Sequence, residues 1–203
     1  TPRLPRDVFM ALARICGRMG SGRAVVTLEA HMDTPDPELR TNILAALSAC
    51  DYHSHDPESI KSRMWAEAQQ YTYLLATQHD LGGGEAMGLL ITGIQNLLRQ
   101  NSERILYLLS FIHDSFAILR AREALLTRNS EVRAVGLEIL DTYFDKSAKM
   151  TLMPVFDDLP PGERLRKMQT SFPQQALGRE TRFLELLARP LTPWLNACTL
   201  YAA

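Results

Sequence analysis

Apolar residues recur at intervals of three and four along most of this chain, and short polar or glycine-containing segments interrupt them. Such spacing places the apolar side chains on one face of an α-helix, and no stretch shows the alternation that a half-buried strand requires. Composition agrees, because 52 residues are Leu or Ala and only 15 are Val or Ile. We therefore expect an all-α protein.

Three of the expected helix starts share a pattern of capping residue, first-turn residue and apolar helix. Asp36, Asn129 and Thr192 each stand directly before such a helix, where a side-chain oxygen can accept hydrogen bonds from the free amides of the first turn. Small residues in the middle of the following helices would let a neighbouring helix approach closely. This arrangement is typical of stacked antiparallel helix pairs.

Two apolar stripes predict unusually long helices, of roughly 20 and 28 residues against a usual mean near 12. One starts at Pro57 and the other near Gly84, so Leu81–Gly84 would form the turn of a long antiparallel hairpin. The first stripe consists of Ile60, Met64, Ala68, Tyr71 and Leu75, and the second of Met87, Leu90, Ile91, Ile94, Leu98, Ile105, Leu108 and Ile112.

The residues 36–40, with their echoes around Arg133 and Trp194, resemble HEAT repeats. A longer similarity is to the soluble helical-repeat region of bacterial ATP/ADP translocase-like carriers, which are related to the major facilitators. It covers residues 117–125, 133–141, 152–159 and 163–165. The resemblance implies a cytosolic attachment of a membrane carrier, without a catalytic residue. Together these patterns predict one domain over residues 1–203, a right-handed α-α superhelix of degenerate HEAT-like pairs with a long central hairpin.

No apolar run approaches the roughly 20 residues that a membrane-spanning helix needs. The chain lacks an initiating Met and a signal peptide, and its last residues read as part of a helix. We therefore expect a piece of a larger protein, located in the cytoplasm at the inner face of a bacterial membrane. Cys16, Cys50 and Cys198 form no metal-binding or disulfide pattern, which predicts buried thiols in a reducing compartment.

Histidine and aspartate occur together at three places, and each can be a helix cap or a reactive group. The cluster 53–56, with His31 and Asp33 earlier, holds zinc-ligand types but lacks the companion spacing of a metal motif, so a turn that caps the helix at Pro57 is favoured. The pairs 79–80 and 113–114 have no nucleophile or oxyanion site beside them. The glycines 82–84 lack the Lys-Ser/Thr of a P-loop. We expect no catalytic residue, no metal, no cofactor and no enzyme activity.

The charges nearly balance, with 22 Lys and Arg against 23 Asp and Glu, which argues against a nucleic-acid partner. The basic residues at 120, 122, 128, 133, 164, 166, 167, 179 and 182 alternate with acidic ones, which is typical of a solvated face. We expect a protein partner or adjoining domains of the same chain, a membrane only through flanking segments, and no small-molecule substrate. The candidate interaction residues are Arg120, Arg122, Arg133, Trp65, Tyr73 and Trp194.

The sequence thus predicts a non-catalytic scaffold, the interaction or regulatory region of a carrier-like membrane protein. One alternative is a stand-alone HEAT-repeat scaffold that binds proteins. Two others are a HEAT-fold alkylpurine DNA glycosylase, which would need a basic groove with exposed aromatic residues, and a relative of the phycobilin lyases. The net charge of −1 speaks against the glycosylase.

Overall fold

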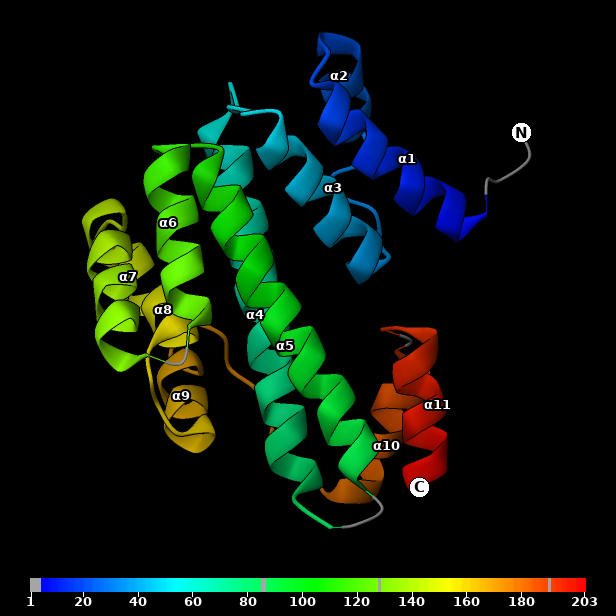
Figure 1. Ribbon diagram of the computed structural model, residues 1–203. Coiled ribbons are helices and arrows are strands. Elements are labelled where there is room, and N and C mark those ends of the chain that lie inside the picture. The colour runs from blue at the N-terminus through cyan, green and yellow to red at the C-terminus, as the bar shows by residue number, and fades with distance from the viewer. Residues whose placement is uncertain (1–4, 85–86, 128, 190) are drawn as a thin grey trace. The chain divides into compact units, whose positions relative to one another are not determined.

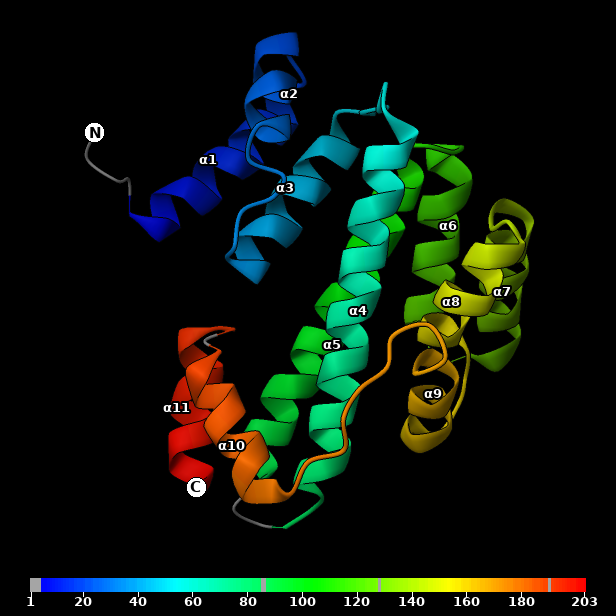
Figure 2. The same ribbon diagram turned by 180° about the vertical axis from the view of Figure 1, so that it is seen from behind.

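All regular structure in the part of the chain that the computed structural model describes is α-helical, which confirms the all-α class (Figures 1 and 2). The described residues are 5–84, 87–127, 129–189 and 191–203. The helices are α1 (Arg6–Met19), α2 (Gly22–Glu29), α3 (Pro37–Ala49), α4 (Pro57–Leu81), α5 (Gly88–Ser110), α6 (Ser115–Leu126), α7 (Ser130–Tyr143), α8 (Lys146–Phe156), α9 (Pro161–Met168), α10 (Arg179–Ala188) and α11 (Pro193–Ala202).

The three predicted capping residues all begin a helix. Asp36 accepts hydrogen bonds from the amides of Glu38 and Leu39 at the start of α3, both at 3.0 Å. Asn129 does the same for the first turn of α7, at 2.9 and 3.2 Å. Thr192 accepts from the amide of Leu195 in α11 at 3.0 Å. Local hydrogen bonding therefore determines where these helices start.

The two long helices are present, with 25 residues in α4 and 23 in α5. All five residues of the predicted α4 stripe are buried, and none is more than 3% exposed. The second helix is shorter than expected, because it begins at Gly88 and ends at Ser110. Of the three glycines of the turn, Gly82 and Gly84 have positive φ, which favours glycine there.

The chain forms two compact units, each built from two separate segments. Unit 1 comprises the described residues up to Met64 together with Glu103–Gly136, and unit 2 comprises Trp65–Ser102 and Leu137–Ala203. The helices α4, α5 and α7 each contribute to both units. The prediction of one solenoid over residues 1–203 stays a prediction.

In unit 1, α1 packs against both α2 and α3, and α2 also contacts α3 (Figure 1). The contact between α1 and α3 is close at Gly17, where an added Cβ would lie 2.9 Å from both Cα and Cβ of Ala46. Arg6 joins the same two helices, because its guanidinium pairs with Asp36 and Glu38. Because Gly17 and Ala46 are small, the axes of α1 and α3 can approach closely. The ion pairs of Arg6 lie at one edge of this contact.

The rest of unit 1 connects α3 to the C-terminal part of α5. Tyr52, in the segment between α3 and α4, packs edge-on against Phe111, with ring centroids 5.1 Å apart. The amide of Ser54 donates to the carbonyl of Phe111 at 2.9 Å. Arg104 is 2% exposed and donates to the carbonyl of Pro37 and to the hydroxyl of Thr41, at 3.2 and 3.0 Å. Buried polar groups therefore hold α5 to the start of α3.

In unit 2, α8 packs against α9 and α10 against α11, and parts of α4, α5 and α7 belong to the same unit. Asn101 donates to the backbone and side-chain oxygens of Glu67, at 3.1 and 2.9 Å, which joins α5 to α4 through a buried polar contact. Arg164 on α9 donates to the hydroxyl of Tyr71 on α4 at 3.0 Å. Figure 2 shows the chain running from α9 past α4 to α10.

Some sequence-based expectations about burial are wrong. Val132, Val135 and Ile139 have the three- and four-residue spacing that predicts one apolar face of α7, yet Val132 and Val135 are 42% and 52% exposed. Of the three cysteines only Cys198 is buried, whereas Cys16 and Cys50 are half-buried, and all three are free thiols. Periodicity identifies the face of a helix that a neighbour covers, but it does not show whether the neighbour covers all of that face.

Candidate interaction faces

Two of the arginines expected at an interaction surface form internal contacts of unit 1. Arg122 on α6 is half-buried, and its guanidinium carbon lies 5.0 Å from the ring centroid of Tyr107 on α5. Arg133 on α7 donates from Nη1 to the carbonyl of Leu125 near the end of α6. Arginine donors near a helix C-terminus satisfy carbonyls that have no partner within the helix. These contacts join α5, α6 and α7.

Arg120 lies on the exposed side of α6, with its guanidinium 5.9 Å from the ring centroid of Phe116. Phe116 is 71% exposed and precedes Arg120 by one helical turn. Sequence analysis identified the arginine and missed the phenylalanine, although a spacing of four residues places both on one face. The two side chains present an aromatic ring and a cation side by side to solvent.

Tyr73 lies in the core of unit 2, with 5% exposure. Two guanidinium groups approach its ring, that of Arg182 on α10 at 5.6 Å and that of Arg189, directly after α10, at 4.8 Å. Burial is the main reason that the pKa of the Tyr73 phenol is raised. The structure therefore makes Tyr73 a packing residue between α4 and α10.

Arg182 is itself a correction to the sequence analysis, which placed it on a solvated face. Its side chain is 2% exposed, and its Nε donates to Asp80 at 3.0 Å. The same carboxylate accepts from the amide of Leu177 at 3.2 Å, and Glu185 pairs with the Nη1 of Arg182. Burial lowers the pKa of Arg182, but the hydrogen bond and charge of Asp80, with Glu185, more than compensate, so the net pKa is raised. The charge of Arg182 is therefore buried in the core of unit 2 and is not part of a solvated face.

The two tryptophans differ in exposure. Trp65 on α4 is half-buried, whereas Trp194 at the start of α11 is 61% exposed. The indole of Trp194 lies beside Gly93 of α5, where an added Cβ would be 3.8 Å from its Nε1. Tyr201, two turns further along α11, is 73% exposed. Trp194 is therefore held at its inner edge while most of its surface stays available.

The sequence-based candidates do not include an exposed row of apolar residues on α1. Val8, Leu12, Ile15 and Met19 on α1 are 41%, 41%, 51% and 65% exposed. Their spacing of four, three and four residues puts them on one stripe. We call this stripe the outer seam of α1. The spacing of these four residues is visible in the sequence. The opposite face of α1 is apolar as well, so the spacing alone does not show which of the two faces is buried.

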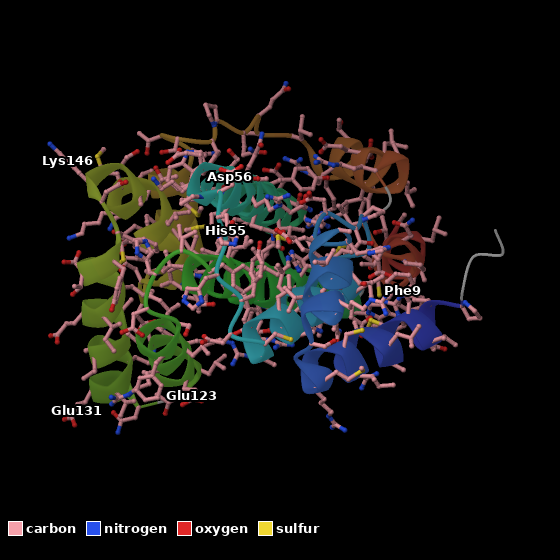
Figure 3. All side chains as sticks on the ribbon, turned by 90° about the horizontal axis from the view of Figure 1, so that it is seen from above. Phe9, His55, Asp56, Glu123, Glu131 and Lys146 are labelled. Carbon is pink, nitrogen blue, oxygen red and sulfur yellow. The ribbon has the colours of Figure 1, made fainter. Side chains whose placement is uncertain are left out.

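The histidine and aspartate clusters at 53–56 and 113–114 form a turn and helix caps, whereas Asp80 of the pair 79–80 is the buried partner of Arg182. Asp56 accepts from the amide of Ser59 in the first turn of α4 at 3.1 Å, and Ser54 accepts from the amide of Asp56 at the same distance. Figure 3 shows His55 and Asp56 in the segment that leads into α4. Asp114 caps α6 through the amide of Ala117 at 3.1 Å. Among the described residues no group of three or more His, Cys, Asp or Glu side chains is placed to hold a metal ion.

Three comparisons with known proteins identified no relative of this chain. No protein-family model matches the chain, and no curated protein and no solved structure matches it significantly. Over the described part of the chain, no helix combines the length and the apolarity that crossing a bilayer requires. The exposed faces of α1, α6 and α11 are the candidate interaction faces.

Proposed function

We propose that this chain is a non-catalytic helical scaffold, built of HEAT-like helix pairs, that binds protein partners through exposed aromatic side chains. The observation that carries the proposal is the exposure of Phe116 and Trp194, at 71% and 61%. Aromatic residues and arginine dominate the binding energy of protein interfaces. Phe116 lies beside Arg120, and Trp194 lies beside Gly93. Aromatic side chains have only two χ angles, so ordering them on binding costs little conformational entropy.

Site-specific photo-crosslinking in the native host tests the proposal. A benzophenone side chain is placed at Phe116 or Trp194, and at the exposed polar positions Thr27 and Glu180 as matched controls for each unit. We expect discrete protein adducts from the two aromatic positions and none from the controls. Adducts that are equal at all four positions, or absent from all, would overturn the proposal.

A finer proposal rests on the resemblance to carrier repeat regions: the partner is an adjoining domain of the same polypeptide, at the cytosolic face of a bacterial membrane. Sequencing the reading frame through both ends tests it. We expect about ten or more apolar segments of roughly 20 residues before Thr1. Flanks that encode only further helix pairs would leave a stand-alone scaffold.

The enzyme alternative with the sharpest test is the DNA glycosylase. A scaffold of this charge should show no tight, salt-sensitive binding to duplex DNA. An electrophoretic mobility assay at physiological salt measures it, and submicromolar affinity would favour the glycosylase over the scaffold.

A further inference from the structure

The helix α1 has two apolar faces on opposite sides, and only one of them is covered. Met10, Ala13 and Gly17 are buried, and the last of these contacts α3 at Ala46. At 100° per residue the outer seam, Val8 to Met19, points almost directly away from this buried face. An exposed apolar face opposite a packed one is the arrangement of a helix that lies between two neighbours.

The shape of the outer seam favours a helix as its neighbour. Its four residues lie within about 60° of the helix circumference and extend over about 16 Å, or three turns. A narrow stripe with spacings of four and three is the seam of a coiled coil, whereas a helix that lies on a membrane presents a wider apolar face. Aromatic residues that would anchor it in a lipid interface are absent from the four.

The order of residues along the seam makes it complementary to itself. The spacing of four, three and four is symmetric about a point between Ala13 and Arg14, so an antiparallel copy places Leu12 opposite Ile15 and Val8 opposite Met19. In heptad terms each a position then meets a d position of the other helix, as in antiparallel coiled coils. A parallel copy would instead pair each residue with itself.

Two of the three charged residues on one flank of the seam agree with the antiparallel pairing, and the third, Arg14, donates to the carbonyl of Met10 on the buried face of α1 at 3.3 Å. Asp7 lies near the N-terminal end of α1 and Arg18 near its C-terminal end, both exposed and on the same flank. Antiparallel pairing brings Asp7 of each copy near Arg18 of the other, twice across the two-fold axis. The opposite flank is occupied within the chain, because the ring of Phe9 lies against that of His31, with centroids 5.2 Å apart and planes tilted by 56°.

From this geometry we propose that the outer seam of α1 is a self-association site, which pairs antiparallel with α1 of a second copy of this chain. Only four side chains of each copy enter the seam, so the contact falls among small interfaces and the dimer is a weak, reversible one. The inference is independent of the proposed function, which rests on α6 and α11.

Sedimentation velocity over a concentration series of the full chain tests the association. We expect the weight-average mass to rise above 22.9 kDa towards twice that value as concentration increases. Ile15→Glu places two charges in the apolar seam and should weaken association by about two orders of magnitude or more. Val26→Glu is the matched control, since Val26 is 66% exposed on α2 and lies outside the seam.

A charge swap tests the orientation. Asp7→Arg or Arg18→Asp alone puts like charges together and should weaken the dimer by roughly fivefold, given two exposed pairs. The double variant Asp7→Arg with Arg18→Asp should restore wild-type association. A structural role for either residue predicts no such rescue, and circular dichroism of each variant checks that the helices are intact.

Three results would overturn the proposal. The first is a constant mass of 22.9 kDa for wild type at concentrations up to about 1 mM, where a weak dimer would be populated. The second is equal loss in Ile15→Glu and Val26→Glu, and the third is a double swap that fails to recover. Binding to phosphatidylglycerol vesicles without self-association would assign the seam to lipid instead.

Discussion

The contact of α1 with α3 and the contact of α4 with α10 join helices in different ways. In unit 1 the helices meet at small residues, with Gly17 against Ala46, and the ion pairs of Arg6 with Asp36 and Glu38 lie at the edge of the contact. In unit 2 the helices meet around Asp80 and Arg182, which are 6% and 2% exposed. One contact depends on close approach, and the other depends on full compensation of buried charge.

Because of this difference, we expect the two contacts to respond differently to side-chain substitutions. An apolar contact loses stability in proportion to the side-chain volume removed. A buried ion pair loses far more when one partner is removed than when both are replaced, because the remaining charge has lost its compensation. Substitutions at the two contacts should therefore differ in size and in whether a second substitution can repair the first.

The largest expected effect is at the ion pair. Asp80→Ala leaves Arg182 buried beside Tyr73 with only Glu185 as a carboxylate partner, and should reduce the free energy of unfolding by about 3–5 kcal/mol. Urea denaturation measures it, with the exposed Glu180→Ala on α10 as a control expected to change it by about 0.5 kcal/mol. The double variant Asp80→Ala with Arg182→Leu should recover much of the loss. A loss below about 1 kcal/mol in the single variant would contradict a structural role for the pair.

The second prediction compares the two faces of α1 through one methionine on each face. Met10 is 8% exposed on the inner face and Met19 is 65% exposed on the outer seam. Met10→Ala should cost about 2–3 kcal/mol, because it leaves a cavity against α3. Met19→Ala should change the stability of the monomer by about 0.5 kcal/mol or less. Urea denaturation at low protein concentration compares them, and equal losses would contradict the assignment of the two faces.

The smallest expected effect is a dependence on pH at the edge of the α1–α3 contact. The hydrogen bond from Arg6 is the main reason that the pKa of Asp36 lies below its ordinary value of 3.8. A carboxylate with a lowered pKa in the folded state stabilises the protein above its unfolded pKa and loses that contribution as pH falls through the folded value. Stability should therefore decline below about pH 4.

Asp36→Asn isolates this charge, because asparagine caps a helix as well as aspartate does. Urea denaturation at pH 6 and pH 3 should show a smaller decline in the variant than in wild type. Some decline should remain, since the hydrogen bond from Arg63 also lowers the pKa of Asp33. An identical decline in both proteins would exclude Asp36 as its source.

The sequence was sufficient where local physics determines the outcome. Asp36, Asn129 and Thr192 were assigned as caps because a side-chain oxygen satisfies amides only two or three residues away. The long helices were recognised because their stripes repeat over many turns. The candidate site was less accessible: of six predicted interaction residues, Arg120 and Trp194 are exposed, Tyr73 is buried, and Arg122, Arg133 and Trp65 are half-buried.

By itself the sequence determined the helical class, the helix starts and the apolar stripes, because these depend on neighbours within one or two turns. Only the tertiary structure decided that Arg182 is buried against Asp80, 102 positions away, and that the outer seam of α1 is exposed in the part of the chain that the structure describes. Burial of a charge and exposure of an apolar face both depend on which distant helix packs against that position. No spacing within a single helix encodes that choice.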